Sequence, residues 1–221
     1  MAEASTSPHA AGQTAGAAPA PRTIHPFWVR ATHWINAFAI LLMVTSGWQI
    51  YNASPIFRGE GGAPLFRFPL EITLGKWLGG ALLWHFAAMW LLVLNGLVYL
   101  TLGIVTNRFR MKLFPLSIKG FIEDSLAALT GKLSHANLSH YNMIQKVLYL
   151  GVILLGVLVV LSGLAIWKPV QFQELTWLMG GYEFARVVHF VAMAGIVAFV
   201  VLHVTVAVLV PKSFIAMLRG R

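Results

Sequence analysis

Four long apolar stretches divide this sequence, at about residues 27–51, 75–102, 144–167 and 184–210. Each is at least as long as the roughly 20 residues that a helix needs to cross the hydrocarbon core of a bilayer. Backbone polar groups inside lipid must be satisfied within the segment, so each stretch is expected to be helical. The predicted fold is an all-α integral membrane protein, a bundle of four transmembrane helices.

Composition supports this assignment and narrows the chemistry. Hydrophobic residues make up 58% of the chain and charged residues only 10%, which is far from a soluble domain. The net charge of +9 is expected to come from basic residues that flank the membrane, so nucleic acid is not an expected partner. Cysteine is absent, which excludes disulfides and iron-sulfur clusters held by this chain. Imidazole is therefore the leading candidate metal ligand.

The connections between the spans predict an orientation. Residues 1–21 lack any apolar run and are expected to be a disordered tail, which leaves residues 22–221 as the membrane domain. Eleven Lys and Arg residues belong to one set of connections and five to the other, so the positive-inside rule predicts that both termini lie in the cytoplasm. The larger set is Arg22, Arg30, Arg108, Arg110, Lys112, Lys119, Lys132, Lys146, Lys212, Arg219 and Arg221; the smaller is Arg58, Arg67, Lys76, Lys168 and Arg186.

The long connection between spans two and three carries its own helical pattern. Apolar residues recur at helical spacing over residues 118–129, whereas Lys119, Glu123 and Asp124 lie off that stripe. We expect a short amphipathic helix lying on the cytoplasmic membrane surface. A simple anchor for the loop is the plainer interpretation of the same pattern.

Four histidines lie inside the spans and pair by depth. His189 and His203 are 14 residues apart in the fourth span, so they share one helix face and lie about 21 Å apart along its axis. In the predicted topology His33 has the depth of His203 on the cytoplasmic side, and His85 has the depth of His189 on the outer side. A lone helical histidine more often only packs or forms a hydrogen bond, but intramembrane ionisable groups are costly and usually functional. The others, His9, His25, His135 and His140, lie outside the spans.

Haem suits two such pairs better than zinc does. A zinc site usually has four protein ligands, or three with carboxylate support nearby, and no Asp or Glu lies within these spans. Haem needs only two axial ligands and an apolar slot, and two axial imidazoles leave no open position on the iron. Glycines inside the spans would let a flat macrocycle approach the backbone, with Gly195 the most suggestive, although helix packing also explains such glycines. The predicted chemistry is electron relay across the bilayer through two haems.

Arginines accompany one histidine of each pair. Arg30 precedes His33 by three residues, and Arg186 precedes His189 by three. Each arginine is thus about one turn nearer its membrane surface, where a guanidinium could pair with a haem propionate. Snorkelling of a long basic side chain to the interface explains the same positions.

The chain resembles the bacterial cytochrome b561 and Ni,Fe-hydrogenase B-type cytochrome superfamily over about residues 24–218, and most closely its thiosulfate-reductase-like cytochrome b subunits. The resemblance lies in HPFWVRATHWINAFAILLMVTSGWQIY, LLWHFAAMW, YNMIQKVLYLGVILLGVLVVLSGLAIWKPVQF and ARVVHFVAMAGIVAFVVLHVTVA. It implies two b haems ligated by His33 with His203 and by His85 with His189. It also implies quinone exchange near the cytoplasmic haem, where Asn142, Gln145 and Lys146 match a polar cluster of the family. Helix capping is the alternative role for these three residues.

The resemblance further implies a periplasmic redox partner, in the first place a molybdopterin oxidoreductase, with a Ni,Fe-hydrogenase or a c-type cytochrome as alternatives. The leading function is therefore a dihaem subunit of the bacterial inner membrane that links the quinone pool to that partner. Quinone oxidation or reduction would be the only chemistry on this chain. Two alternatives remain: a self-contained superoxide:quinone oxidoreductase, and a metal-ion transporter, for which acidic residues in the spans would be expected.

Overall fold

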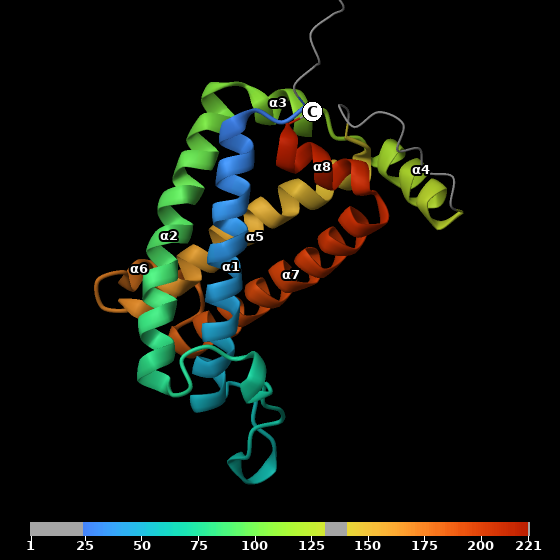
Figure 1. Ribbon diagram of the computed structural model, residues 1–221. Coiled ribbons are helices and arrows are strands. Elements are labelled where there is room, and N and C mark those ends of the chain that lie inside the picture. Colours follow the sequence, from blue (N-terminus) through green and yellow to red (C-terminus); the bar gives the residue numbers. More distant parts are fainter. Residues whose placement is uncertain (1–23, 131–140, 221) are drawn as a thin grey trace, which may run out of the picture.

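The computed structural model describes residues 24–130 and 141–220, and all regular elements in these ranges are helical. Four helices are long and apolar enough to cross a membrane: α1 (Phe27–Ala53), α2 (Leu78–Val105), α5 (Met143–Trp167) and α7 (Tyr182–Leu209) (Figure 1). The predicted four-helix membrane fold is confirmed to this extent. The predicted tail, residues 1–21, lies outside the described residues.

Helix α2 begins and ends three residues later than predicted, at Leu78 and Val105 rather than at 75 and 102. The cause is a turn at its start, where Gly75 and Lys76 both have positive φ, +102° and +60°. A Cβ on residue 75 would overlap the backbone nitrogen of Ala81, so this close approach requires glycine. The hydropathy pattern could not show a backbone reversal of this kind.

The connections contain helices that hydropathy alone did not reveal. These are α3 (Arg108–Leu113), α6 (Gln173–Leu178) and α8 (Pro211–Arg219), with short 3-10 turns at Glu60–Gly62 and Leu70–Ile72. Helix α8 starts with Pro211 in its first turn, where proline costs no intrahelical hydrogen bond. Helix α4 (Ile118–Leu129) has the bounds expected for the amphipathic segment. Its apolar residues Ile118 and Leu129 are 83% and 86% exposed.

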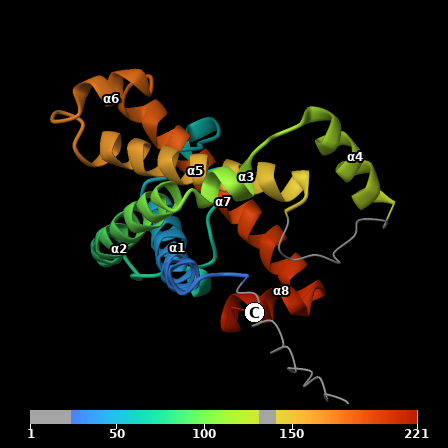
Figure 2. The same ribbon diagram turned by 90° about the horizontal axis from the view of Figure 1, so that it is seen from above.

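The four long helices pack as two antiparallel hairpins. The most extensive backbone packing joins α1 to α2 and α5 to α7. Figure 2 shows α1 and α2 side by side, next to α5 and α7, which cross one another in this view. Val159, Ala192 and Ile196 form a buried core between α5 and α7, against which Ile40 of α1 packs. Many large apolar side chains on the outer faces are exposed, as expected of a surface that meets lipid.

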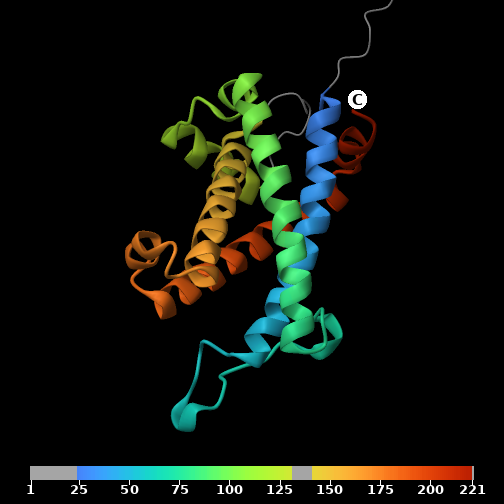
Figure 3. The same ribbon diagram turned by 90° about the vertical axis from the view of Figure 1, so that its left-hand side faces the viewer.

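The described chain ends meet at one end of the bundle. The Ile24 amide donates to the Gly220 carbonyl at 2.9 Å, and the Arg30 guanidinium donates to the Leu218 carbonyl at 2.6 Å. We call this the termini end. Residues 54–77 and α6 lie at the other end, called the loop end, as Figure 3 shows.

Candidate functional site

Two histidine pairs lie inside the helical bundle, one towards each end. His33 of α1 lies beside His203 of α7, with ring centroids 5.9 Å apart and planes at 55°. His85 of α2 lies beside His189 of α7, with centroids 6.4 Å apart and planes at 64°. We call the first pair the near site, because it is towards the termini end, and the second the far site.

The ring separations suit one metal atom between each pair of imidazoles. Two metal–nitrogen bonds of about 2 Å each, with about 1 Å from each nitrogen to its ring centre, give a centroid separation of about 6 Å. Within residues 24–130 and 141–220, no three His, Cys, Asp or Glu side chains gather to hold a metal. The donor set is therefore two imidazoles per site, which fits a haem iron and does not fit a structural zinc.

The surroundings of the far site are apolar. Both rings line a cavity of about 40 Å³, and all four long helices contribute to its wall. Apart from the histidines, that wall consists of Ile40, Met43, Val44, Leu92, Val159, Met193 and Ile196. Such a lining excludes water and is the environment that a macrocycle requires.

Each far-site histidine also contacts a buried serine. The Oγ of Ser46 on α1 lies 3.0 Å from His85 Nδ1, and the Oγ of Ser162 on α5 lies 3.1 Å from His189 Nδ1. Both serines are 0% exposed. Sequence reasoning missed them, although the dipeptide Ser-Gly occurs in both the first and the third span.

The glycine that follows each serine leaves room for the imidazole ring. A Cβ on Gly47 would lie 3.5 Å from His85 Cε1, and a Cβ on Gly163 would lie 3.2 Å from His189 Cε1. A Cβ on Gly195, the glycine favoured from its place between two histidines, would instead meet Leu155 Cδ1 at 3.0 Å. A Cβ would therefore be tight against the ring only at Gly163, whereas at Gly47 it would make an ordinary contact and at Gly195 it would meet a leucine of α5.

The near site has a different setting, dominated by aromatic rings. Phe199 stacks on His203, with centroids 5.6 Å apart and planes at 12°, and Trp34 meets His33 edge-on at 5.1 Å. The Nδ1 atom of His33 is buried and has no hydrogen-bond partner. This orphaned nitrogen is the main polar irregularity of the near site.

Arg30 and Arg186 each bond to a segment distant in the sequence, one at each end of the bundle. Besides its bond to Leu218, Arg30 has a buried Nε without a hydrogen-bond partner. Arg186 donates to the Glu183 carboxylate at 2.9 Å, and to the Ser54 carbonyl and hydroxyl at 2.7 and 3.0 Å. Both guanidinium groups therefore already bind protein groups of neighbouring segments.

Asn142 and Gln145 form a capping box at the start of α5. The Asn142 side chain accepts from the Gln145 amide at 2.8 Å, and the Gln145 side chain accepts from the Asn142 amide at 3.2 Å. Lys146 donates to the Pro115 carbonyl at 3.2 Å from an exposed position. The local hydrogen bonds thus give the first two residues a structural role, which stabilises the helix start.

A cluster of basic and aromatic residues at the termini end was not expected from the sequence. Arg108 donates to the Ile24 carbonyl at 3.3 Å and lies 3.4 Å from His25 Nδ1. Burial, followed by the nearby charges of Arg108 and Lys112, lowers the pKa of His25 to about 4. His25 is therefore neutral at physiological pH.

Aromatic contacts connect this cluster with the near site. Lys112 lies over the Tyr141 ring at 5.7 Å, Tyr141 meets Tyr149 at 5.0 Å, and Tyr149 meets Phe199 at 6.4 Å. Since Phe199 stacks on His203, the path runs unbroken from the surface cluster to a near-site imidazole. Burial raises the pKa of Tyr141, so its hydroxyl stays protonated.

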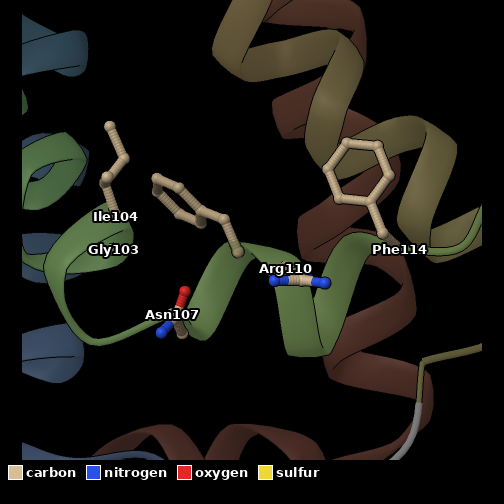
Figure 4. A pocket seen from close by; sticks show the side chains of 6 residues that line it. Gly103, Ile104, Asn107, Arg110 and Phe114 are labelled. Carbon is tan, nitrogen blue, oxygen red and sulfur yellow. The ribbon is translucent and has the colours of Figure 1, made fainter.

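A second cavity lies at the same end but away from the histidines. Its volume is about 270 Å³, and it opens between the end of α2 and α3 (Figure 4). Gly103, Ile104, Asn107, Phe109, Arg110 and Phe114 line it. None of the residues predicted for the haem or quinone sites contributes to this cavity.

An aromatic cluster adjoins the far site at the loop end. Tyr51 stacks on Phe66 at 4.9 Å and meets Phe190 at 5.2 Å, and Phe57 meets Phe190 at 5.3 Å. Phe190 directly follows His189 in the chain. The connection between α1 and α2 is thereby packed against Phe190, the residue next to His189.

Comparison with known proteins agrees with this geometry. The family model for prokaryotic cytochrome b561 matches residues 24–220. A relative from Azospira oryzae, assigned as a protein-methionine-sulfoxide reductase subunit, YedZ1, is 55% identical over 197 residues, which is 89% of this chain and 96% of the relative. The chain is a multi-pass membrane protein that binds haem and transfers electrons. This conclusion rests on the four apolar helices and on the match to the cytochrome b561 family model. It belongs to the prokaryotic cytochrome b561 family.

Proposed function

We propose that this chain is a dihaem cytochrome b subunit that carries electrons across the membrane between the quinone pool and a periplasmic oxidoreductase. The observation that carries the proposal is the presence of two imidazole pairs, His33 with His203 and His85 with His189, whose centroids are 5.9 and 6.4 Å apart. Helix α7 contributes one histidine to each pair. The two sites are thus about 21 Å apart along one helix, enough to cover most of the hydrocarbon core.

Each pair would hold one haem b, which would supply one-electron chemistry when bound. With two imidazoles as its protein ligands, such a haem would have no open position for oxygen or a substrate and would carry electrons. The apolar wall around His85 and His189 excludes water from the ligands. The protein's own contribution is therefore to orient imidazoles and to keep the sites dry.

We place this subunit in the bacterial inner membrane, with the termini end in the cytoplasm and the loop end in the periplasm. The excess of Lys and Arg in the connections at the termini end supports this orientation. In this frame the near site is cytoplasmic and the far site is periplasmic. Helix α4, with its exposed apolar residues Ile118 and Leu129, would lie on the cytoplasmic membrane surface.

The partner we propose is a periplasmic molybdopterin oxidoreductase that reduces methionine sulfoxide in proteins. The 55% identical relative, named as a subunit of a protein-methionine-sulfoxide reductase, supports this choice over a Ni,Fe-hydrogenase or a c-type cytochrome. The partner would dock at the loop end, where Tyr51 and Phe57 pack on Phe190, the residue next to His189.

We propose that quinone is exchanged at the cytoplasmic end, close to the near site. Asn142 and Gln145 cap α5 at this end, while Lys146 presents an exposed ammonium group. The path from Tyr141 through Tyr149 and Phe199 to His203 would couple a quinone bound there to the near site. Lys146 is the member of the predicted cluster best placed to contact the quinone.

Arg30 and Arg186 are proposed to pair with haem propionates. The unpartnered Nε of Arg30 supports this role at the near site, because a buried donor without an acceptor is costly. At the far site, Arg186 would have to share its guanidinium between Glu183, Ser54 and a propionate.

A reduced-minus-oxidised spectrum with haem quantification on the purified protein tests the proposal. We expect two haems b per chain, one of which is lost in His189→Ala and the other in the near-site variant His33→Ala. The matched control is His25→Gln, which replaces a histidine outside the spans and should retain both haems. A wild-type chain with one haem or none would contradict the dihaem proposal, and quinone turnover with superoxide by the chain alone would favour a self-contained enzyme.

A further inference from the structure

The two serines beside the far site occupy equivalent places in the two hairpins. Ser46 lies on α1 and contacts a histidine of its hairpin partner α2, and Ser162 lies on α5 and contacts a histidine of its hairpin partner α7. Each is followed by the glycine that faces the same ring. The far site is therefore built from two copies of one local arrangement.

The hydrogen of each serine hydroxyl already has an acceptor. Ser46 donates to the Leu42 carbonyl at 2.6 Å, and Ser162 donates to the Leu158 carbonyl at 2.7 Å. A hydroxyl group has only one hydrogen, so its oxygen is left to accept a bond from the ring. The ring nitrogen that faces each serine must then carry the hydrogen. This assignment places a hydrogen on Nδ1 of both His85 and His189.

We infer that Ser46 and Ser162 are positioning residues that hold both far-site imidazoles in the Nδ1–H form, with the lone pair on Nε2 available to an iron. The inference rests on the proposed haem function. A neutral imidazole ligates a metal through the nitrogen that lacks the hydrogen, and a partner on the other nitrogen selects which one that is. Gly163 completes the arrangement at His189, since a Cβ there would lie 3.2 Å from Cε1 of the ring, and Gly47 lies in the equivalent place beside His85.

At the near site no serine of the described residues accepts a hydrogen bond from His33, whose Nδ1 is buried without a hydrogen-bond partner. A hydrogen bond donated by Nδ1–H makes an imidazole a stronger electron donor to a metal. A stronger donor favours the oxidised iron, so each serine should lower the midpoint potential of the far-site haem. The serines are therefore expected to separate the potentials of two haems that have the same axial ligands.

Redox titration of the purified holoprotein, read by optical spectra and by the EPR signals of the oxidised haems, tests this role. In Ser46→Ala and Ser162→Ala we expect both haems to be retained, one midpoint potential to move to a more positive value, and the other to stay. The double variant should move the same potential further, and the EPR g-values of that haem alone should change.

The matched control is Thr45→Ala. Thr45 adjoins Ser46 and makes the same type of bond, to the Leu41 carbonyl at 2.8 Å, from a more exposed position. Its removal should leave both potentials in place. If an alanine variant loses the far-site haem, Ser46→Thr and Ser162→Thr, which keep the hydroxyl, should restore it.

Two outcomes would overturn the inference: alanine variants with two haems and unchanged potentials, or an equal shift in Thr45→Ala. The haem content of the wild-type chain separates failure of this inference from failure of the proposed function. Fewer than two haems there refutes the proposed function, whereas two haems with insensitive potentials refute only the role of the serines.

Discussion

The near and far sites offer the same pair of ligands in opposite settings. At the far site both rings contact a buried serine that is itself bound to the backbone, and a glycine admits each ring. At the near site His33 has an unpartnered Nδ1, and the neighbours are the aromatic rings of Trp34 and Phe199. The side chains that contact the four imidazoles therefore distinguish two sites whose histidine pairs are alike.

The largest expected effect is the loss of one haem by changing one ligand. His85→Ala should remove the far-site haem and leave about half of the wild-type haem, because the near site takes its ligands from other residues. His203→Ala should remove the near-site haem instead. The two residual spectra should differ, which haem quantification and low-temperature difference spectra would show. Loss of both haems in either variant would mean that the sites do not act separately.

The next effect concerns the glycines of the far site. In Gly163→Ala the new Cβ would lie 3.2 Å from His189 Cε1, so the ring must shift and far-site haem occupancy should fall while the near site stays occupied. Gly151→Ala on the same helix is the control, since a Cβ there meets no atom within 4 Å. Equal haem content in the two variants would show that the far site tolerates the shift.

A smaller effect is expected from Arg186→Leu. Removing a positive charge near a haem disfavours the reduced iron, so the far-site midpoint potential should fall by about 40 mV, on the order of 1 kcal/mol. Lys168→Leu, which removes a charge that lies over Trp167 at the same end, should shift it less. Redox titration measures both. An unchanged potential in Arg186→Leu would exclude propionate pairing.

The last effect is a pH dependence of stability that is confined to the termini end and leaves both haem sites unchanged. The folded state lowers the pKa of His25 from 6.5 to about 4, so between these values the unfolded chain binds more protons. The stabilising contribution of neutral His25 is present above pH 6.5 and is lost as the pH falls towards 4. Thermal unfolding in detergent should show this loss in the wild type and a weaker one in His25→Gln. If stability depends on pH equally in the wild type and in His25→Gln, His25 is not the cause of the loss at low pH.

The sequence predicted positions along the helices better than orientations around them. The number of spans and the facing of His33 with His203 and of His85 with His189 follow from depth alone, and the structure brings these rings together. Which glycine faces a ring depends on rotation about the helix axis, which depth does not encode. For this reason Gly195 was favoured, although Gly163 is the glycine that faces His189.

Tertiary contacts explain the other residues that the sequence did not reveal. Ser46 and Ser162 look like ordinary small residues of membrane helices until the opposing histidine is placed beside them. The start of α2 was set too early because Gly75 and Lys76 are compatible with an apolar run but have positive φ. Helices α3, α6 and α8 are too short for a hydropathy pattern to reveal.

The division into two hairpins has a consequence for how the protein is made. Neither histidine pair belongs to a single hairpin, because α7 supplies one ligand of each pair while α1 and α2 supply the others. Each haem would therefore link the first hairpin to the second. Without haem, the most extensive backbone packing lies within each hairpin, between α1 and α2 and between α5 and α7. Contacts such as Ile40 against the α5–α7 core already join the two hairpins, and bound haem would add to them. A ligand that binds the folded state stabilises it, so the amount of this protein in a cell should rise with the haem supply.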